Sequence, residues 1–392
     1  MEVTDNTWLP RTLRRVSFIV LTFGLVGCAS LISQGALSPP MLNLDLLEDE
    51  QMSAIGYQSD QFCSQQPLPS GETQQLCLAY LQAPAYHQSS REAWRVEADR
   101  WADDAPFSTR AMEVQLRFWP GQAVATSPMA GDRALADSVA TEDNIVMSYV
   151  IELNTTRGDD VLAMVLDHPV ADTTKGTYVL VHGFRTNKES LFFVAEALRY
   201  HGYDVVLVDL FGHGQSEGNF SFSGKPDAQA ISQLIDALEI STPLHLLGMS
   251  MGGTTSTHLA KLRDDVTSLT LLAPMLEFAD AFVDAGRAYT RTAHLVPQSS
   301  LYKGAEYALN EAGTSKEDTA VVNQVAELNI PVLIMGSSND KISPLSKLEG
   351  LHGGQVMVHS VEPRTHHGMI LWDTEDVVLW HEWVQRAVNS YE

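Results

Sequence analysis

Residues 244–253 constrain the fold of this chain more than any other stretch. An apolar run of strand length ends there in Gly-x-Ser-x-Gly, and a segment compatible with a helix follows at residues 254–262. A strand, a tight turn and a helix with serine at the turn form a nucleophile elbow. Small residues must flank such a turn because its backbone is strained. We expect the Ser250 hydroxyl to emerge near a helix N-terminus, where an oxyanion is favoured.

The pentapeptide alone is weak evidence, because chance supplies such short motifs. The composition is that of a globular protein and not of a disordered one: 44% of the 392 residues are hydrophobic and 19% are charged. The formal net charge of −24 would repel phosphate backbones, so nucleic acid is not an expected partner. We attribute the acidic surface to solubility; selection of cationic substrates is an alternative without specific support.

The N-terminus is typical of a secretory signal. Three arginines precede a short apolar stretch, residues 16–26, which ends in Leu25-Val26-Gly27-Cys28. The stretch is too short to span a bilayer comfortably. An ordinary export signal or an uncleaved anchor remains an alternative to a cleaved lipoprotein signal.

The last four residues of this stretch resemble a bacterial lipobox. That resemblance implies cleavage after residue 27 and a diacylglycerol on the thiol of Cys28, which would hold the protein on a membrane surface. Ala29, rather than aspartate, follows the cysteine, which resembles outer-membrane sorting in a Gram-negative cell. We therefore expect a lipid-anchored protein of the cell envelope.

Two further cysteines, Cys63 and Cys77, remain after such cleavage. An even number of cysteines in an exported chain suggests a disulfide. Closing a loop of this size would contribute about 3 kcal/mol in the chain-entropy model. Metal binding is the weaker interpretation, because no Cys or His pair lies at finger spacing around them.

Residues 28–140 are an extension about which the sequence says little. Residues 29–45 are typical of a tether, residues 46–120 carry mixed helical signals, and residues 121–140 are typical of a loop or linker. We interpret the aromatic residues of the extension as packing against the main domain; a lid over the site is the alternative.

From residue 144 onward the pattern alternates between strands and helices. We expect strands at residues 145–153, 161–167, 178–181, 204–209, 268–272, 331–335 and 355–361, besides the one entering the elbow, and helices near residues 189–201, 226–238 and 374–389. The first two strands are joined by a hairpin signal. Such alternation predicts an α/β fold, a doubly wound, mostly parallel sheet at residues 141–392. Residues 275–328 interrupt the rhythm and predict a small helical cap over the substrate pocket; helices packed on the side of the sheet are the alternative.

Acyl transfer needs a nucleophile, a base and a group that orients the base. Ser250 is the candidate nucleophile, and Asp340 follows a later buried run. Glu277 and Asp280 are fallback choices for the acid. The base is expected in the loop Thr365-His366-His367-Gly368, ahead of the final helix. No carboxylate or cysteine set at ligand spacing supports a metal site there.

These motifs together resemble the α/β-hydrolase family of serine hydrolases over residues 144–392. The resemblance rests on His182-Gly183-Phe184, on the loop Asp209-Leu-Phe-Gly-His-Gly-Gln-Ser-Glu-Gly218, on the elbow, and on the order Ser, Asp, His. It implies that the N–H groups of Phe184 and Met251 form the oxyanion hole. It also implies that His182 and His213 are structural. A His-Gly pair is common at the base, which favours His367 over His366.

The resemblance implies a serine ester hydrolase, carboxylesterase-like or lipase-like, that acts on a small-molecule or lipid ester without a cofactor or metal. Acyl transfer, thioester hydrolysis and peptide hydrolysis are possible on the same residues. A surface binding module that retains the fold without catalysis is the alternative of another class. An intact set of Ser250, Asp340 and histidine argues against it, because a binding module has no chemical need for all three.

Overall fold

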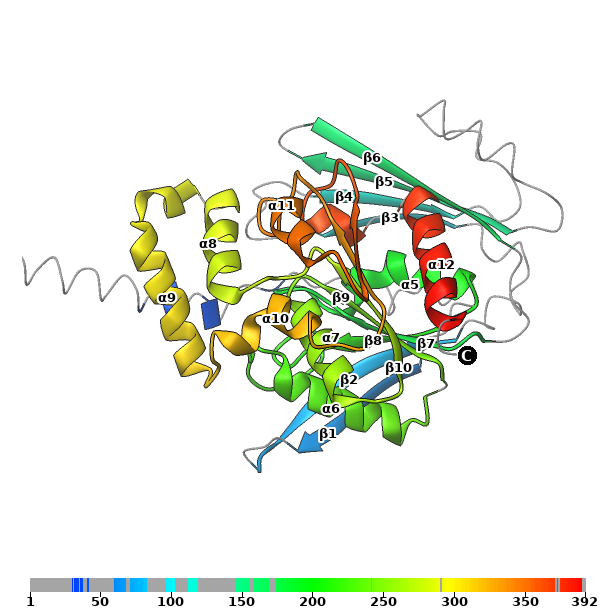
Figure 1. Cartoon of the computed structure of the whole chain (residues 1–392). Helices are drawn as coiled ribbons and strands as arrows, with labels where there is room; N and C mark the ends of the chain where they lie inside the picture. The colour runs from blue at the N-terminus through cyan, green and yellow to red at the C-terminus, as the bar shows by residue number, and fades with distance from the viewer. Residues whose placement is uncertain are drawn as a thin grey trace, which may run out of the picture.

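Eight strands form one central sheet, in the order β1-β2-β8-β7-β9-β10-β11-β12 (Figure 1). The strands are β1 (Asp60–Pro67), β2 (Thr73–Leu81), β7 (Thr177–Val181), β8 (Asp204–Asp209), β9 (Leu244–Met249), β10 (Val266–Leu272), β11 (Val332–Gly336) and β12 (Val356–Ser360). The last six named are parallel to one another, and β1 and β2 form an antiparallel edge next to β8. The predicted mostly parallel sheet is confirmed.

The structure is a computed structural model. It describes residues 60–67, 71–82, 96–102, 112–118, 145–155, 158–168, 174–240, 242–289, 291–370, 372 and 374–389, and a few residues between 30 and 41. The predicted signal peptide, Cys28, and the linker at residues 121–140 lie outside the described residues. Within the described part of the chain, no helix is long and apolar enough to cross a membrane.

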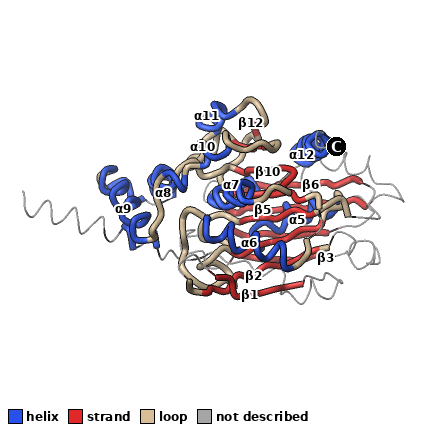
Figure 2. The backbone as a smooth tube through the Cα atoms, turned by 60° about the horizontal axis from the view of Figure 1, so that its bottom comes forward, coloured by secondary structure: helices blue, strands red, loops and turns tan. Residues whose placement is uncertain are grey.

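Helices cover both faces of the sheet (Figure 2). The strands divide their side chains between two hydrophobic cores. In β7, Tyr178 and Leu180 point to the core shared with α5 (Phe192–Tyr200) and α12 (Thr374–Asn389). The alternate residues of β7 point to the core shared with α6 (Lys225–Ala237) and α7 (Met251–Leu262). A strand buried on both faces must be apolar throughout, which is why these strands appear as continuous apolar runs in the sequence.

The extension contributes strands to the sheet, which the sequence did not indicate. Mixed helical signals were predicted at residues 46–120, but the residues described there form β1, β2, β3 (Val96–Ala102) and β4 (Met112–Phe118). The sheet was predicted within residues 141–392, but it also includes β1 and β2 from the extension. The physical reason is that β2 is stabilised by pairing with β8, a tertiary contact that local propensity does not reveal.

Two smaller sheets and a helical insertion complete the described fold. β3 pairs with β4, and β5 (Ile145–Thr155) pairs with β6 (Gly158–His168) as the predicted hairpin. Between β10 and β11 lie α8 (Phe278–Tyr289), η3 (Arg291–Leu295), α9 (Gln298–Glu311), η4 (Glu317–Thr319) and α10 (Val321–Val325). The predicted helical insertion is confirmed, and α8 and α9 project beyond one end of the sheet (Figure 1). Its role as a cap over the substrate stays a prediction.

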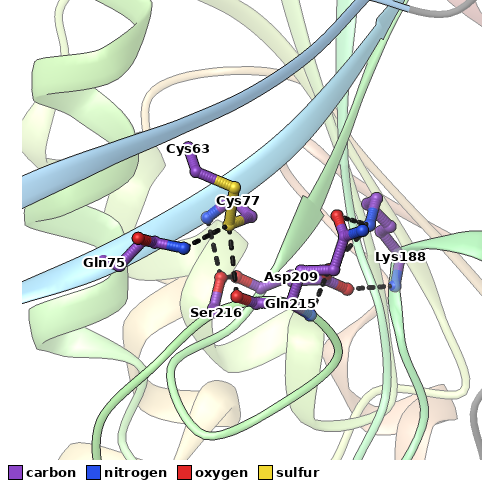
Figure 3. The surroundings of a disulfide bond; sticks show 7 residues. All are labelled: Cys63, Gln75, Cys77, Lys188, Asp209, Gln215 and Ser216. Carbon is purple, nitrogen blue, oxygen red and sulfur yellow. Dashed lines mark hydrogen bonds and ion pairs between the residues drawn. A yellow bond between two sulfur atoms is a disulfide. The ribbon is translucent and has the colours of Figure 1, made fainter.

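The predicted disulfide joins Cys63 of β1 to Cys77 of β2, with the two sulfur atoms 2.06 Å apart. The two residues are direct partners across the antiparallel pair. Cys77 is also the partner of Asp209 at the end of β8, so the disulfide lies beside the loop that leaves that strand (Figure 3).

Candidate active site

The chain turns at Ser250 from β9 into α7 with a left-handed backbone, φ +51°. The flanking glycines are required by space. A Cβ on Gly248 would lie 2.5 Å from the carbonyl oxygen of Gly252, and a Cβ on Gly252 would lie 2.1 Å from that of Val181. The N–H of Ser250 donates to the carbonyl of Leu272 at 2.9 Å. The predicted elbow is therefore present, and its strain is fixed by neighbouring strands.

Ser250 is the first member of a three-residue hydrogen-bond chain. Its Oγ lies 2.9 Å from Nε2 of His366, and Nδ1 of His366 lies 2.7 Å from Oδ2 of Asp340. Asp340 follows β11 and His366 follows β12, so both come from the carboxyl ends of neighbouring parallel strands. Because the carboxyl ends of parallel strands share one edge of the sheet, residues distant in sequence meet here.

The structure corrects which histidine faces the serine: the sequence favoured His367, but His366 lies next to Ser250. His366 occupies the position between Ser250 and Asp340, whereas residue 367 already begins the 3₁₀ turn His367–Ile370. Adjacent loop residues project in different directions, and the backbone path decides which one faces the serine. The Thr-His-His-Gly sequence contains no periodicity that could have shown this path.

The two fallback acids have other partners. Glu277 forms an ion pair with Lys316 at 2.9 Å, and Asp280 accepts a hydrogen bond from the hydroxyl of Tyr302 at 2.8 Å. Asp340 is therefore the carboxylate that the structure brings to the histidine. Among the described residues, no group of three His, Cys, Asp or Glu side chains could hold a metal ion.

The environment of Asp340 favours its charged form. Burial, the largest single cause, would raise the pKa of Asp340, but the hydrogen bonds that its carboxylate accepts, first among them that of His366, together lower the pKa below its usual value. The backbone N–H groups of Ile342 and Ser343 act in the same direction, donating to Oδ1 at 2.8 and 3.0 Å. An ionised Asp340 requires Nδ1 of His366 to carry a proton, which leaves Nε2 free to accept one from Ser250.

The predicted oxyanion donors lie on two segments beside the serine. A Cβ on Gly183 would lie 3.4 Å from Cβ of Ser250, so the turn that carries Phe184 lies against the elbow. Met251 is the first residue of α7, and its N–H has no acceptor within the helix. These positions suit the predicted donors; the donation itself stays a prediction.

His182 and His213 hold the backbone on either side of Phe184. Nε2 of His182 accepts the N–H of Leu210 at 3.1 Å, so Nδ1 carries the proton and donates to the carbonyl of Gly183 at 2.7 Å. Nε2 of His213 accepts the N–H of Arg185 at 3.2 Å. Burial lowers the pKa of both histidines, that of His213 to about 3, which keeps the rings neutral and able to accept. The predicted structural placement of both residues is confirmed.

A buried ion pair that the sequence did not indicate lies behind this turn (Figure 3). Nζ of Lys188 lies 2.8 Å from Oδ2 of Asp209, and the backbone N–H of Lys188 donates to Oδ1 at 2.7 Å. Gln215 adds its Oε1 to the ammonium at 2.9 Å. The hydroxyl of Ser216 links the backbone of Asp209 to the N–H of Cys77, the disulfide residue. The side chain of Lys188 is 1% exposed, and a charge buried to this extent needs such partners.

Comparison with known proteins gives matches to hydrolases. The sequence profile of the group described as "Serine aminopeptidase, S33" matches residues 172–317. Lipase 1 of Psychrobacter immobilis is 35% identical over 97 residues, and lipase 3 of Moraxella sp. (strain TA144) is 34% identical over the same length. Each match covers 24% of this chain and 30% of the lipase, so the chain spans under a third of the length of either relative.

Comparison with solved structures gives matches to esterases at low sequence identity. An esterase of Pyrococcus furiosus covers 70% of this chain and 98% of its own length, at 15% identity and a TM-score of 0.44. An esterase of Exiguobacterium antarcticum covers 62% of this chain and 96% of its own, at 18% identity and a TM-score of 0.41. With its mostly parallel eight-stranded sheet, helices on both faces and a serine elbow after β9, this chain has the α/β-hydrolase fold.

Proposed function

We propose that this protein is a serine hydrolase that cleaves carboxylic esters through an acyl-enzyme on Ser250. The observation that carries the proposal is the continuous chain from Ser250 Oγ to His366 to Asp340, at 2.9 and 2.7 Å, on a strained elbow. The local matches to two lipases support the choice of esters as substrates. Fold alone would not, because this fold serves many chemistries.

The positions of these atoms support the following mechanism. His366 Nε2 takes the proton of Ser250 as Oγ attacks the ester carbonyl carbon. Asp340 keeps the imidazole oriented and stabilises the imidazolium that forms. The imidazolium then gives its proton to the departing alkoxide, and the acyl group remains on Oγ. Water, deprotonated by the same histidine, attacks the acyl carbon and releases the carboxylic acid and the free serine.

The oxyanion formed in each step would accept hydrogen bonds from the N–H groups of Phe184 and Met251. Each such donor is typically worth about 3–4 kcal/mol in the transition state. Their placement beside Ser250, by the Gly183 turn and at the start of α7, supports this part of the proposal.

A fluorophosphonate probe tests the nucleophile. The purified wild-type protein should be labelled and should hydrolyse a short p-nitrophenyl ester, and Ser250→Ala should do neither. Equal labelling of the variant, or no labelling and no turnover of the wild type, would contradict the proposal. The second outcome would favour the binding-module interpretation.

Peptide hydrolysis is the second candidate, because the matched group is described as a serine aminopeptidase. Aminoacyl p-nitroanilides, thioesters and p-nitrophenyl esters of increasing acyl length, assayed side by side, separate the alternatives. The ester proposal expects the largest kcat/KM among the esters. A larger value for an aminoacyl anilide or a thioester would reassign the substrate class, and transfer to an added alcohol would indicate an acyltransferase.

We further propose that the protein is exported and anchored in the cell envelope through a diacylglycerol on Cys28, on an outer-membrane surface. The lipobox-like Leu25-Val26-Gly27-Cys28 behind a basic and apolar segment supports this proposal. Mass spectrometry of the N-terminal peptide tests it. An unmodified Cys28 on the exported protein, or an intact residue 1–27 segment, would contradict it.

A further inference from the structure

The hydroxyl of Ser337 connects the loop that carries the acid to the segment that carries the base. Ser337 directly follows β11 and is fully buried. Its Oγ donates to Oε2 of Glu362 at 2.9 Å and accepts the backbone N–H groups of Asn339 and Arg364, both at 3.1 Å. One hydroxyl therefore uses its donor and both of its acceptor sites.

These partners lie next to the two residues that act on the serine. Asn339 immediately precedes Asp340, and Arg364 lies two positions before His366. Glu362 also accepts the N–H of Ser338, so the contact between the two segments is double. Ser337 therefore links the acid loop to the base segment in addition to the hydrogen bond between Asp340 and His366.

The side chain of Arg364 attaches the segment that carries His366 to helix α12. The guanidinium of Arg364 forms a buried ion pair with Asp376 of α12 at 2.8 Å, and its other terminal nitrogen lies 3.5 Å from the carbonyl of Gly368. His366 therefore lies on a short segment held to α12 by the side chain of Arg364 and to the acid loop by the backbone of Arg364. Ser337 supplies the second of these two attachments.

We propose that Ser337 is a positioning residue for the reaction, acting through the relative placement of Asp340 and His366. This inference rests on the proposed function of the triad. Removing the hydroxyl leaves two N–H groups and a carboxylate oxygen without their partner, and the two segments can shift apart. Misplacement of a catalytic group by about 1 Å can cost about a hundredfold in rate.

The test compares Ser337→Ala with Ser268→Ala, a matched variant. Ser268 is also fully buried, and its hydroxyl lies 2.8 Å from Nδ1 of His245 near the N-terminal ends of β10 and β9, away from the carboxyl ends that carry the site. Ser337→Ala should lower kcat for a p-nitrophenyl ester about tenfold to a hundredfold with KM unchanged, whereas Ser268→Ala should change kcat less than twofold. Thermal unfolding should place both variants within a few degrees of each other.

A double-mutant cycle distinguishes positioning from a general structural role. The rate of Ser250 labelling by a fluorophosphonate is measured for wild type, Ser337→Ala, Asp340→Ala and the double variant. If Ser337 acts through the acid, its loss should slow the Asp340→Ala protein less than twofold. A slowing as large as that in the wild-type background would overturn the proposal.

The remaining outcomes are also decisive. If Ser337→Ala does not fold, Glu362→Ala tests the same link from its exposed end, and an unchanged kcat there would overturn the inference. If the wild type is active, Ser250→Ala is inactive, and Ser337→Ala matches Ser268→Ala in kcat, the inference fails while the proposed function stands. A wild type without turnover or labelling would instead contradict the proposed function itself.

Discussion

The two sides of Ser250 are supported in different ways. On the oxyanion side, Lys188 and Asp209 form an ion pair with side chains 1% and 0% exposed, behind a turn held by two neutral histidines. On the acid–base side, the neutral hydroxyl of Ser337 joins the two segments, and the buried ion pair of Arg364 with Asp376 attaches the base segment to α12. The oxyanion side therefore depends on a buried charge pair next to its turn, whereas the link between the acid and base segments depends on shared hydrogen bonds.

We expect variants on the oxyanion side to change mainly the stability of the protein, and variants on the acid–base side to change mainly the rate of the reaction. A buried charge that loses its partner is strongly destabilising, so damage to the oxyanion side should first unfold the protein. A lost hydroxyl costs less in folding free energy, so damage to the acid–base side should leave a folded protein whose catalytic groups are misplaced. The predictions below test this division, beginning with the base itself.

The largest effect is expected on the acid–base side, at His366. The substitution His366→Ala should lower kcat by about 10⁴-fold or more, because the serine then has no base. His367→Ala should stay within a few-fold of wild type. Turnover of a short p-nitrophenyl ester measures both. The reverse result would return the role of base to His367 and invalidate the comparison.

On the oxyanion side, Asp209→Ala should destabilise the protein by about 3–5 kcal/mol, because it leaves the Lys188 ammonium buried without its carboxylate. Glu327→Ala is the matched control. It breaks the ion pair of Lys261 and Glu327, in which the two side chains are 38% and 63% exposed. The unfolding free energy should fall by less than about 1 kcal/mol. Urea unfolding measures both. Similar losses for the two variants would show that burial of the pair is not what matters.

The disulfide adjoins the oxyanion side and should affect stability more than rate. The double variant Cys63→Ser with Cys77→Ser should lose about 3 kcal/mol of unfolding free energy, since the unfolded chain is no longer cross-linked. The N–H of Cys77 still reaches Oγ of Ser216, so kcat should change little. Reduction of the wild type should reproduce the variant. A loss of kcat above tenfold at a temperature where the variant is folded would contradict this expectation.

The sequence predicted the parts of the site that depend on local patterns. Ser250 was identified because strand, glycine spacing and helix lie in one stretch, and Asp340 because it directly follows a buried apolar run. The pairing of β2 with β8 and the choice of His366 over its neighbour depend on backbone paths that local patterns do not contain. Lys188 and Ser337 were missed for a related reason. A lysine or serine in a polar loop resembles a solvated residue until its distant partners are known.

The smallest expected effect is a loss of unfolding free energy at acidic pH. It arises from His213, which holds the turn on the oxyanion side. Burial is the largest cause that lowers the pKa of His213 from 6.5 to about 3. Between these values the unfolded chain binds a proton that the folded chain does not, so the unfolding free energy falls as the pH falls. Linkage gives about 1 kcal/mol lost from this group between pH 6.5 and 5.5.

His213→Asn should remove that contribution, so its stability should fall less steeply with acid than that of the wild type, as measured by urea unfolding across this pH range. His245→Asn is the matched control, because burial also lowers the pKa of His245 to about 3 and that residue lies within β9. Both variants should flatten the pH dependence alike. Only His213→Asn should lower kcat, by severalfold. The asparagine side chain extends as far as Nδ1 of the histidine but not as far as Nε2, so the N–H of Arg185 loses its acceptor. Equal kcat in the two variants would mean that the oxyanion turn does not depend on this ring, and that the two sides of Ser250 differ in how they are stabilised but not in how they act on the rate.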